Sequence, residues 1–471
     1  MSQLATSNTH NLRTWLIFLL PSLLGLFLFM TPIPLEGGMT IPIAFMAQSI
    51  KNILSPIINE LITFIICFTG IASILVKVFK PDFVTKSVPL KHLFDTNWLW
   101  FGIRLFGMLF IILTLLSLNG VDVKSIMPEQ LVPILNAITS ENTGGLVLND
   151  LLPILFSVFI LAGLLLPLLL NFGLLELVGT LFTRLMRPLF GVPGRSAVDC
   201  AASWLGDGSV GILMTARQYE QKHYTQREAA IIGTTFSAVS ITFSLVVIEQ
   251  VGLEKLFAPF YLTVCLAGFI AAIIIPRLPP LRFKKDKFID GSERDSKAEK
   301  VPDEKTLLGH SLDVALDKAY KSKGIKGTAK EGLNNALDMV FAVLPVVMAV
   351  GTFALIIAEY TPVFKVLGMP FIPFLELLQI PEAEAASQTV MVGFADMFIP
   401  SILAAGIIES DVTRFIIAAM SVTQLIYMSE VGALLLGSKI PVNIFELFVI
   451  FILRTLITLP VIAFMAHWLV G

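Results

Sequence analysis

Long apolar runs separated by short polar turns dominate the chain. Runs of about 20 apolar residues form helices long enough to cross a hydrocarbon core of roughly 30 Å. Such runs predict nine transmembrane helices, at 14–30, 53–76, 98–118, 151–171, 228–247, 257–275, 334–358, 413–436 and 444–470. Shorter or amphipathic stretches predict interfacial pieces at 131–138, 174–190 and 363–378.

A second pattern occurs twice: two short apolar arms joined by a tip that carries one aspartate. The first copy covers 193–219 with Asp207 at its tip, and the second covers 381–409 with Asp396. An arm of about 10 to 12 residues rises only roughly 15 to 18 Å as a helix, which is too short to span a bilayer. The pattern predicts two re-entrant hairpins whose tips are buried near mid-membrane. The alternative is a pair of packing elements without a ligand.

The charged residues divide the chain further. Residues 277–332 are rich in alternating charges and predict a cytoplasmic linker that is partly disordered or briefly helical. The loops assigned to the cytoplasm hold most of the other basic residues: Lys77, Lys80, Lys86, Lys91, Arg217, Lys222, Arg227 and Lys439. This distribution places the N-terminus inside.

The repeat organises the domains. N-terminal scaffold helices occupy 1–150, a first repeat 151–276, the linker 277–332 and a second repeat 333–471. Each repeat contributes three spans, and an odd number turns the second copy upside down. The first hairpin therefore enters from the cytoplasm and the second from outside, as in transporters with inverted repeats.

Composition narrows the class of protein. Of 471 residues, 55% are hydrophobic and 14% charged, against about 25% charged in a soluble domain. We expect an all-α polytopic membrane protein. The net charge of −2 gives no sign of a nucleic-acid partner, and the three cysteines form neither a disulfide framework nor a CxxC pattern. No phosphate-binding loop or catalytic triad is present, so we expect neither an enzyme nor a bound cofactor.

The two tip aspartates are the first candidates for a binding site. A carboxylate within the membrane costs at least ~2.5 kcal/mol on insertion scales, so it usually faces a cavity or a partner. Asp207 and Asp396 could bind Na⁺, a proton or a substrate ammonium group where two half-helices meet. The alternative is that each aspartate caps the following half-helix.

The helix after each hairpin supplies the other candidates. These candidates are polar residues that recur at helical spacing or stand alone among apolar residues: Ser237, Ser240, Ser421, Gln424, Tyr427 and Glu430. Gln388, in the second hairpin, is the expected companion of Gln424. Stripes of small hydroxyls are most often packing surfaces in membranes. Glu430 stands at a possible helix break, and its alternative role is a neutral acid bonded to a neighbouring helix.

The duplicated hairpin-plus-helix unit resembles the Gate, or nucleoside recognition, domain. That domain recurs in concentrative nucleoside transporters, in ferrous-iron permeases and in spore maturation membrane proteins. The layout of the whole chain is similar to that of the YjiH-type members, with two Gate units and a cytoplasmic linker. The resemblance covers roughly residue 151 to the end and implies solute transport by an elevator-like or hairpin-gated mechanism. It does not imply a nucleoside substrate.

We therefore expect a secondary active transporter of a small polar organic solute, coupled to Na⁺ or H⁺. The alternatives are a non-transporting membrane partner or maturation protein and a metal-cation permease, although the five histidines form no ligand cluster. The expected partners are a small-molecule substrate, the lipid bilayer and further copies of the chain, with no nucleic acid. The expected location is the plasma membrane of a bacterium.

Overall fold

The computed structural model describes residues 11–31, 33–35, 38–79, 93–94, 98–121, 128–205, 208–236, 241–293, 306–322 and 324–470. These residues are helical except for connecting turns and two short strands, β1 (Ile33–Leu35) and β2 (Gly38–Thr40), which pair antiparallel. The α-helices are α2 (Leu12–Met30), α3 (Pro42–Leu54), α4 (Ile58–Phe79), α7 (Trp98–Leu118), α8 (Val132–Thr139), α9 (Leu152–Leu170), α10 (Leu174–Phe190), α11 (Ser196–Leu205), α12 (Gly208–Glu220), α13 (Gln226–Ile231), α14 (Ile241–Gln250), α15 (Phe257–Ile274), α16 (Leu307–Tyr320), α17 (Gly324–Asp338), α18 (Leu344–Tyr360), α19 (Val363–Gly368), α20 (Ile372–Leu377), α21 (Ala383–Val390), α22 (Ile399–Ile407), α23 (Asp411–Gln424), α24 (Val431–Gly437) and α25 (Ile444–Leu469).

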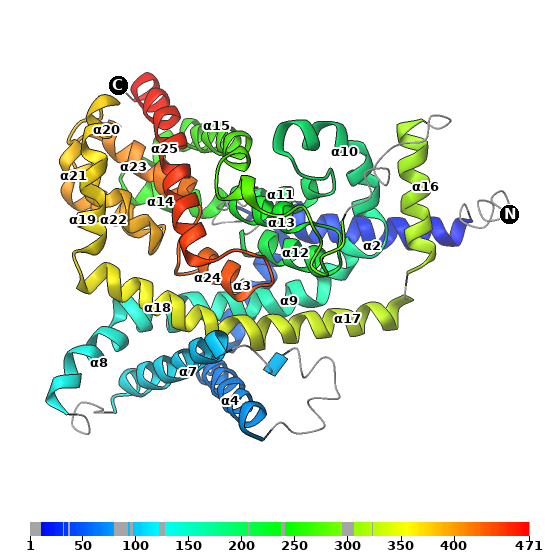
Figure 1. The fold of residues 1–471 in the computed structure, drawn as a ribbon, viewed down its shortest axis with the longest axis horizontal. Helices are drawn as coiled ribbons and strands as arrows, with labels where there is room; N and C mark the ends of the chain where they lie inside the picture. The colour runs from blue at the N-terminus through cyan, green and yellow to red at the C-terminus, as the bar shows by residue number, and fades with distance from the viewer. Residues whose placement is uncertain are drawn as a thin grey trace.

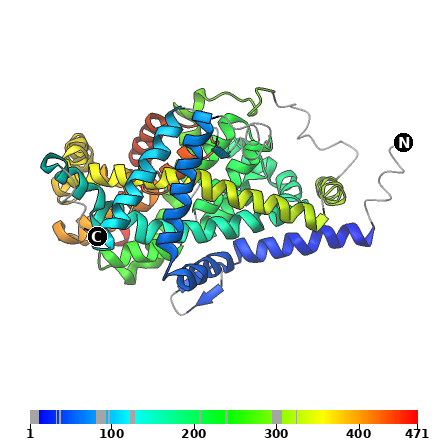
Figure 2. The same ribbon diagram turned by 90° about the horizontal axis from the view of Figure 1, so that it is seen from below.

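Seven helical segments of the described chain are long and apolar enough to cross a membrane: Leu12–Phe29, Ile58–Phe79, Trp98–Leu118, Glu129–Leu170, Glu254–Arg277, Gly324–Tyr360 and Ile444–Leu469. They correspond to seven of the nine predicted spans, and they confirm an all-α polytopic membrane protein. Figure 1 shows that most of the long helices lie side by side in one bundle, and in Figure 2 α2 extends beyond this bundle towards the N-terminus.

One of the two remaining predicted spans is a broken helix, and the other is described only in part. The segment predicted at 413–436 ends as a helix at Gln424 and resumes only at Val431, next to the possible break that the sequence indicated at Glu430. The segment predicted at 228–247 consists of α13, a π-helical turn at Ile232–Phe236 and α14 from Ile241, with 237–240 outside the described residues.

Two long helices carry the same local signature, which shows the repeat. A π-helical turn, Val147–Leu151, passes directly into Leu152-Pro153 of α9, and a second, Met339–Val343, passes into Leu344-Pro345 of α18. Proline lacks the N–H that would bond the carbonyl four residues earlier, and its ring crowds that turn, so a locally wider turn relieves the clash. The predicted domain boundaries at 150/151 and 332/333 fall within these continuous helical segments.

The two long segments pack antiparallel, as an inverted repeat requires (Figure 1). A Cβ on Gly163 of α9 would lie 2.4 Å from the Cα of Ala336 in α17. At the other end, a Cβ on Gly351 of α18 would lie 3.6 Å from the side chain of Val147. Small residues allow this close approach of the two backbones. Residue numbers therefore increase along one segment in the direction in which they decrease along the other.

The charged linker is ordered over much of its described length. Residues 284–290 form a strap, whose carbonyls at Lys285 and Lys287 accept the amide protons of Arg227 (3.1 Å) and Gln226 (2.8 Å) at the start of α13. Later in the linker, α16 buries Leu316 against Phe18 of α2. The linker therefore packs on the membrane helices, although its composition predicted partial disorder.

Candidate functional site

The tip of the second hairpin lies between α21 and α22 and holds Asp396. The Oδ1 atom of Asp396 accepts the amide proton of Phe398 at 2.8 Å, in the turn directly before α22. The Oδ2 atom accepts a hydrogen bond from the Ser429 hydroxyl at 2.7 Å. Asp396 therefore holds this turn and contacts the broken helix, but it does not bond the first-turn amides of α22 as a helix cap would.

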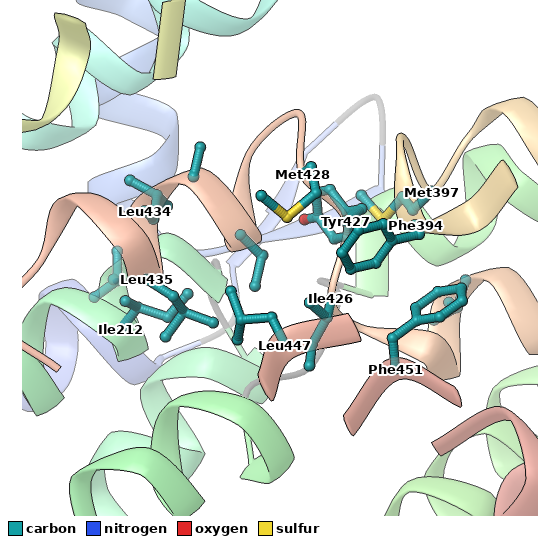
Figure 3. Packing of buried hydrophobic residues seen from close by; sticks show 14 of the residues in the cluster. Ile212, Phe394, Met397, Ile426, Tyr427, Met428, Leu434, Leu435, Leu447 and Phe451 are labelled. Carbon is teal, nitrogen blue, oxygen red and sulfur yellow. The ribbon is translucent and has the colours of Figure 1, made fainter. Parts of the chain in front are cut away.

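The backbone of the tip pairs with the break between α23 and α24. The amides of Met428 and Ser429 donate to the carbonyls of Phe394 (2.8 Å) and Ala395 (2.9 Å). Figure 3 shows apolar packing around the same junction, with Phe394 close to Phe451 of α25 and to the Ile426–Met428 segment. The phenyl rings of Phe394 and Phe451 are 5.3 Å apart and tilted towards an edge contact. The tip is thus closed against the break.

The break begins with a strained residue. Leu425 has φ 65° and ψ −35°, a region that a branched L-residue rarely adopts. The amide of Ile426 donates to the carbonyl of Gln424 at 2.7 Å across this tight turn, in place of a helical bond. Such strain costs of order 1 to 3 kcal/mol and persists only where surrounding contacts hold it. The contacts with the hairpin tip provide that support.

Gln424 joins the broken helix to the first arm of the hairpin. Its side-chain nitrogen donates to the Val390 carbonyl and to the Thr455 hydroxyl, both at 2.9 Å. Its carbonyl oxygen is buried without a hydrogen-bond donor among the described residues. That oxygen lies over Gly393, where a Cβ would come within 2.1 Å of it. The residue predicted as its companion, Gln388, is not one of its partners.

The structure places the other predicted residues as follows. The Ser421 hydroxyl donates to the Ala418 carbonyl at 2.9 Å within its own helix, and the Tyr427 hydroxyl donates to Glu430 at 3.4 Å. Three further candidates, Asp207, Ser237 and Ser240, lie outside the described residues. A binding role for each of these residues stays a prediction.

The first hairpin contains a closed polar network that the sequence did not reveal. Asp199 is buried and accepts hydrogen bonds from Gln218 (2.5 Å), Thr215 (3.1 Å) and Tyr224 (3.0 Å). The side chain of Gln218 in turn accepts from Arg195 at 2.6 Å. A buried carboxylate is stable only when its oxygens are satisfied in this way. The network ties both arms of the hairpin to the turn that precedes α13.

A second residue missed by sequence reasoning is Arg454, in the middle of α25. Its side chain is 2% exposed and donates to two main-chain carbonyls, that of Thr423 at the break after α23 and that of Thr234 in a π-helical turn. The sequence could have singled out Arg454, because it is a lone arginine within a long apolar helix and intramembrane charges mark functional positions.

These contacts define what the candidate site can do. The carboxylate of Asp396 and the hydroxyl of Ser429 meet where a hairpin tip faces a broken helix, and such groups can bind a cation or a polar solute. The amide oxygen of Gln424, which has no donor among the described residues, lies over Gly393 of the same hairpin. Within the described part of the chain, no three His, Cys, Asp or Glu side chains form a group that could hold a metal ion.

Comparison with known proteins identifies the family. The family model described as nucleoside recognition, or Gate, matches residues 152–254, which include the first hairpin and the helical segment after it. A protein of Alkalihalophilus pseudofirmus, described as uncharacterized, is 45% identical over 467 residues, covering 99% of this chain and 97% of that one. No solved structure matches the chain. The chain therefore contains a Gate, or nucleoside recognition, domain, and it belongs to the same family of multi-pass membrane proteins as the Alkalihalophilus pseudofirmus protein.

Proposed function

We propose that the protein is a secondary active transporter that moves a small polar organic solute across the plasma membrane of a bacterium, coupled to Na⁺ or H⁺. The observation that carries the proposal is the closed junction between Asp396 at the hairpin tip and Ser429 at a helix break. An interrupted helix facing a hairpin tip provides polar backbone and a carboxylate at mid-membrane, where a solute can bind.

A hairpin that gates the site must be able to move relative to its surroundings. A cavity of about 370 Å³ separates parts of the second hairpin and the break from α7 and α18. Its lining is apolar and includes Phe106, Phe353, Phe394 and Met428. An apolar boundary contains few hydrogen bonds that would need to be broken during movement. This supports an elevator-like mechanism, in which the hairpin and the break move together relative to α7 and α18. A hairpin-gated mechanism would instead require the tip to release its main-chain bonds to Met428 and Ser429.

The test combines a ligand search with a charge-removing variant. Purified protein would first be screened by thermal shift against nucleosides, amino acids, amines and carboxylates, and hits would be assayed for uptake into liposomes. Asp396→Asn keeps an oxygen that can accept the Phe398 amide proton but removes the charge. We expect its affinity for the coupling ion or solute to fall by one to two orders of magnitude, about 1.4 to 2.8 kcal/mol.

Two further variants separate charge from local structure. Ser429→Ala removes the hydroxyl that contacts Asp396 but leaves the carboxylate, so it should have a smaller effect. Asp411→Asn removes an exposed charge at the start of α23 and should behave as wild type. Wild-type ion and solute dependence in Asp396→Asn would leave Asp396 only the role of holding the turn before α22. An absence of uptake for every ligand that binds would favour a non-transporting partner protein.

A further inference from the structure

Arg454 makes an unusual set of contacts for a buried charged residue. Its Nε atom donates to the carbonyl of Thr423 at 2.9 Å. Its Nη1 atom donates to the carbonyls of Thr234 at 3.3 Å and Thr235 at 3.2 Å. All three acceptors are main-chain oxygens, and they belong to two helices that lie far apart in the sequence.

The three carbonyls lie where regular α-helical bonding is interrupted. Thr423 is in the last turn of α23, and Thr234 and Thr235 are in the π-helical turn Ile232–Phe236. The final carbonyls of a helix such as α23 have no intrahelical donor, and they carry the negative end of its dipole. Together the three oxygens form a cluster suited to a cation.

The repeat explains why the carbonyls converge at one point. The shift in numbering that places Asp207 on Asp396 also places Thr234 on Thr423. Equivalent carbonyls of the two repeats therefore meet at the same guanidinium. The same shift places Cys265 of α15 on Arg454 of α25, and these two helices pack against each other. The guanidinium of Arg454, which only the second repeat supplies, therefore bonds carbonyls of both repeats.

Among the described residues, main-chain carbonyl dipoles compensate the positive charge of Arg454, and no acidic side chain does. No Asp or Glu forms an ion pair with Arg454 among the residues that the structure describes. A buried charge needs compensation, and here the described partners are the three carbonyls. In transporters, the carbonyls of unwound helices commonly coordinate the coupling cation.

We propose that Arg454 is a tethered cation: its guanidinium fills a carbonyl-lined cation site that the two repeats form together, and it excludes a free cation such as Na⁺ from that position. It also joins the end of α23 to the π-helical turn Ile232–Phe236, so that the two change position together. The inference does not depend on transport, because the site is defined by its contacts alone.

Removal of the side chain should turn the site into one that binds an added cation. Arg454→Ala protein in detergent should unfold at a lower temperature than wild type. Millimolar guanidinium or Na⁺, compared at equal ionic strength with choline, should restore part of the loss in a saturable way, because a ligand that binds the folded state stabilises it. Choline is too large for the vacated space, and wild-type protein should show no such response.

A matched control lies one turn further along the same helix. Thr458→Val removes a buried hydroxyl that bonds the Arg454 carbonyl at 2.8 Å, so it should lower stability without any response to cations. Equal responses to guanidinium in wild type, Thr458→Val and Arg454→Ala would overturn the proposal, as would recovery by choline.

A second pair of variants applies if Arg454→Ala cannot be purified. Arg454→Lys keeps the positive charge, whereas Arg454→Gln keeps hydrogen-bonding capacity without it. The lysine variant should unfold at the higher temperature if the carbonyls need a cation. A glutamine variant as stable as the lysine variant, or more stable, would show that hydrogen bonding alone holds the two segments together.

Discussion

At Gly393 the chain has no room for a side chain, because the carbonyl oxygen of Gln424 lies directly over it. Gln424 cannot move aside easily, since its nitrogen is held by Val390 and Thr455. Gly393→Ala should therefore lower the free energy of unfolding by about 1 to 3 kcal/mol, the usual cost of overpacking. Thermal unfolding of the purified protein measures the change.

The same hairpin offers a matched substitution. Gly406 lies in α22 with no atom within 4 Å of an added Cβ, so Gly406→Ala should be neutral or stabilising by roughly 0.5 to 1 kcal/mol. If Gly393→Ala were as stable as Gly406→Ala, the close contact with Gln424 would not exist in solution.

The sequence predicted some residues of the candidate site and missed others. The sequence singled out Gln424 because a buried amide needs partners, and the structure supplies two. It did not predict that Val390 and Thr455 would be those partners, because this depends on how hairpin and helix pack. Arg454 was overlooked although it is a single charge in an apolar helix. Its acceptors are main-chain carbonyls, which leave no mark in the sequence.

At the scale of elements, the strap at 284–290 joins the two repeats. The ammonium group of Lys284 contacts the carboxylate of Glu446 at 2.7 Å at the start of α25, while the strap carbonyls bond the first amides of α13. Near its end, hydrogen bonds from Lys222 and Ser292 lower the pKa of Asp290 below its ordinary 3.8. The Lys222–Asp290 contact is therefore complete at neutral pH and is lost only as the pH falls well below that value.

Removal of the Lys284 contact should loosen the strap. In Lys284→Ala protein we expect faster hydrogen exchange at the amides of Gln226 and Arg227, because their acceptors lie on the released segment. Lys285→Ala is the control, since that side chain is exposed while only its carbonyl bonds α13. Unchanged exchange in Lys284→Ala would mean that the strap is held without its tie to α25.

The elements show what a one-dimensional pattern can and cannot predict. Arm length together with Gly and Pro breaks predicted both hairpins, and the structure has two short packed helices at each place, α11–α12 and α21–α22; that they are re-entrant stays a prediction. The Ser429–Glu430 pair before Val431-Gly432 indicated the break that follows α23. The ordered strap was missed because its stability comes from amides of α13 and from Glu446, which lie far from it in the sequence.

At the scale of the molecule, the antiparallel packing of the two long helical segments fits the inverted arrangement predicted by counting spans. The count of spans predicts that the linker and the base of the second hairpin lie on opposite sides of the membrane. The distribution of Lys and Arg predicts that the linker is cytoplasmic, and with it the N-terminus.

Single cysteines can test this orientation in intact cells. In a variant without native cysteines, Glu384→Cys should react with an impermeant thiol reagent added outside, and Ser292→Cys should react only after the cells are opened. Both positions are exposed, so access is limited by the membrane. Labelling of Ser292→Cys alone in intact cells would reverse the orientation.

The contact between Arg454 and the π-helical turn Ile232–Phe236 also has a consequence in time. Thr234 and Arg454 are 220 positions apart in the chain. At roughly 5 to 20 residues per second, a ribosome needs on the order of ten to forty seconds to make the intervening residues. During that interval the carbonyls of Thr234 and Thr235 have no guanidinium to bond. The contact that joins the two repeats at Arg454 can therefore form only after α25 has been made, and a nascent chain stalled before that point would lack it.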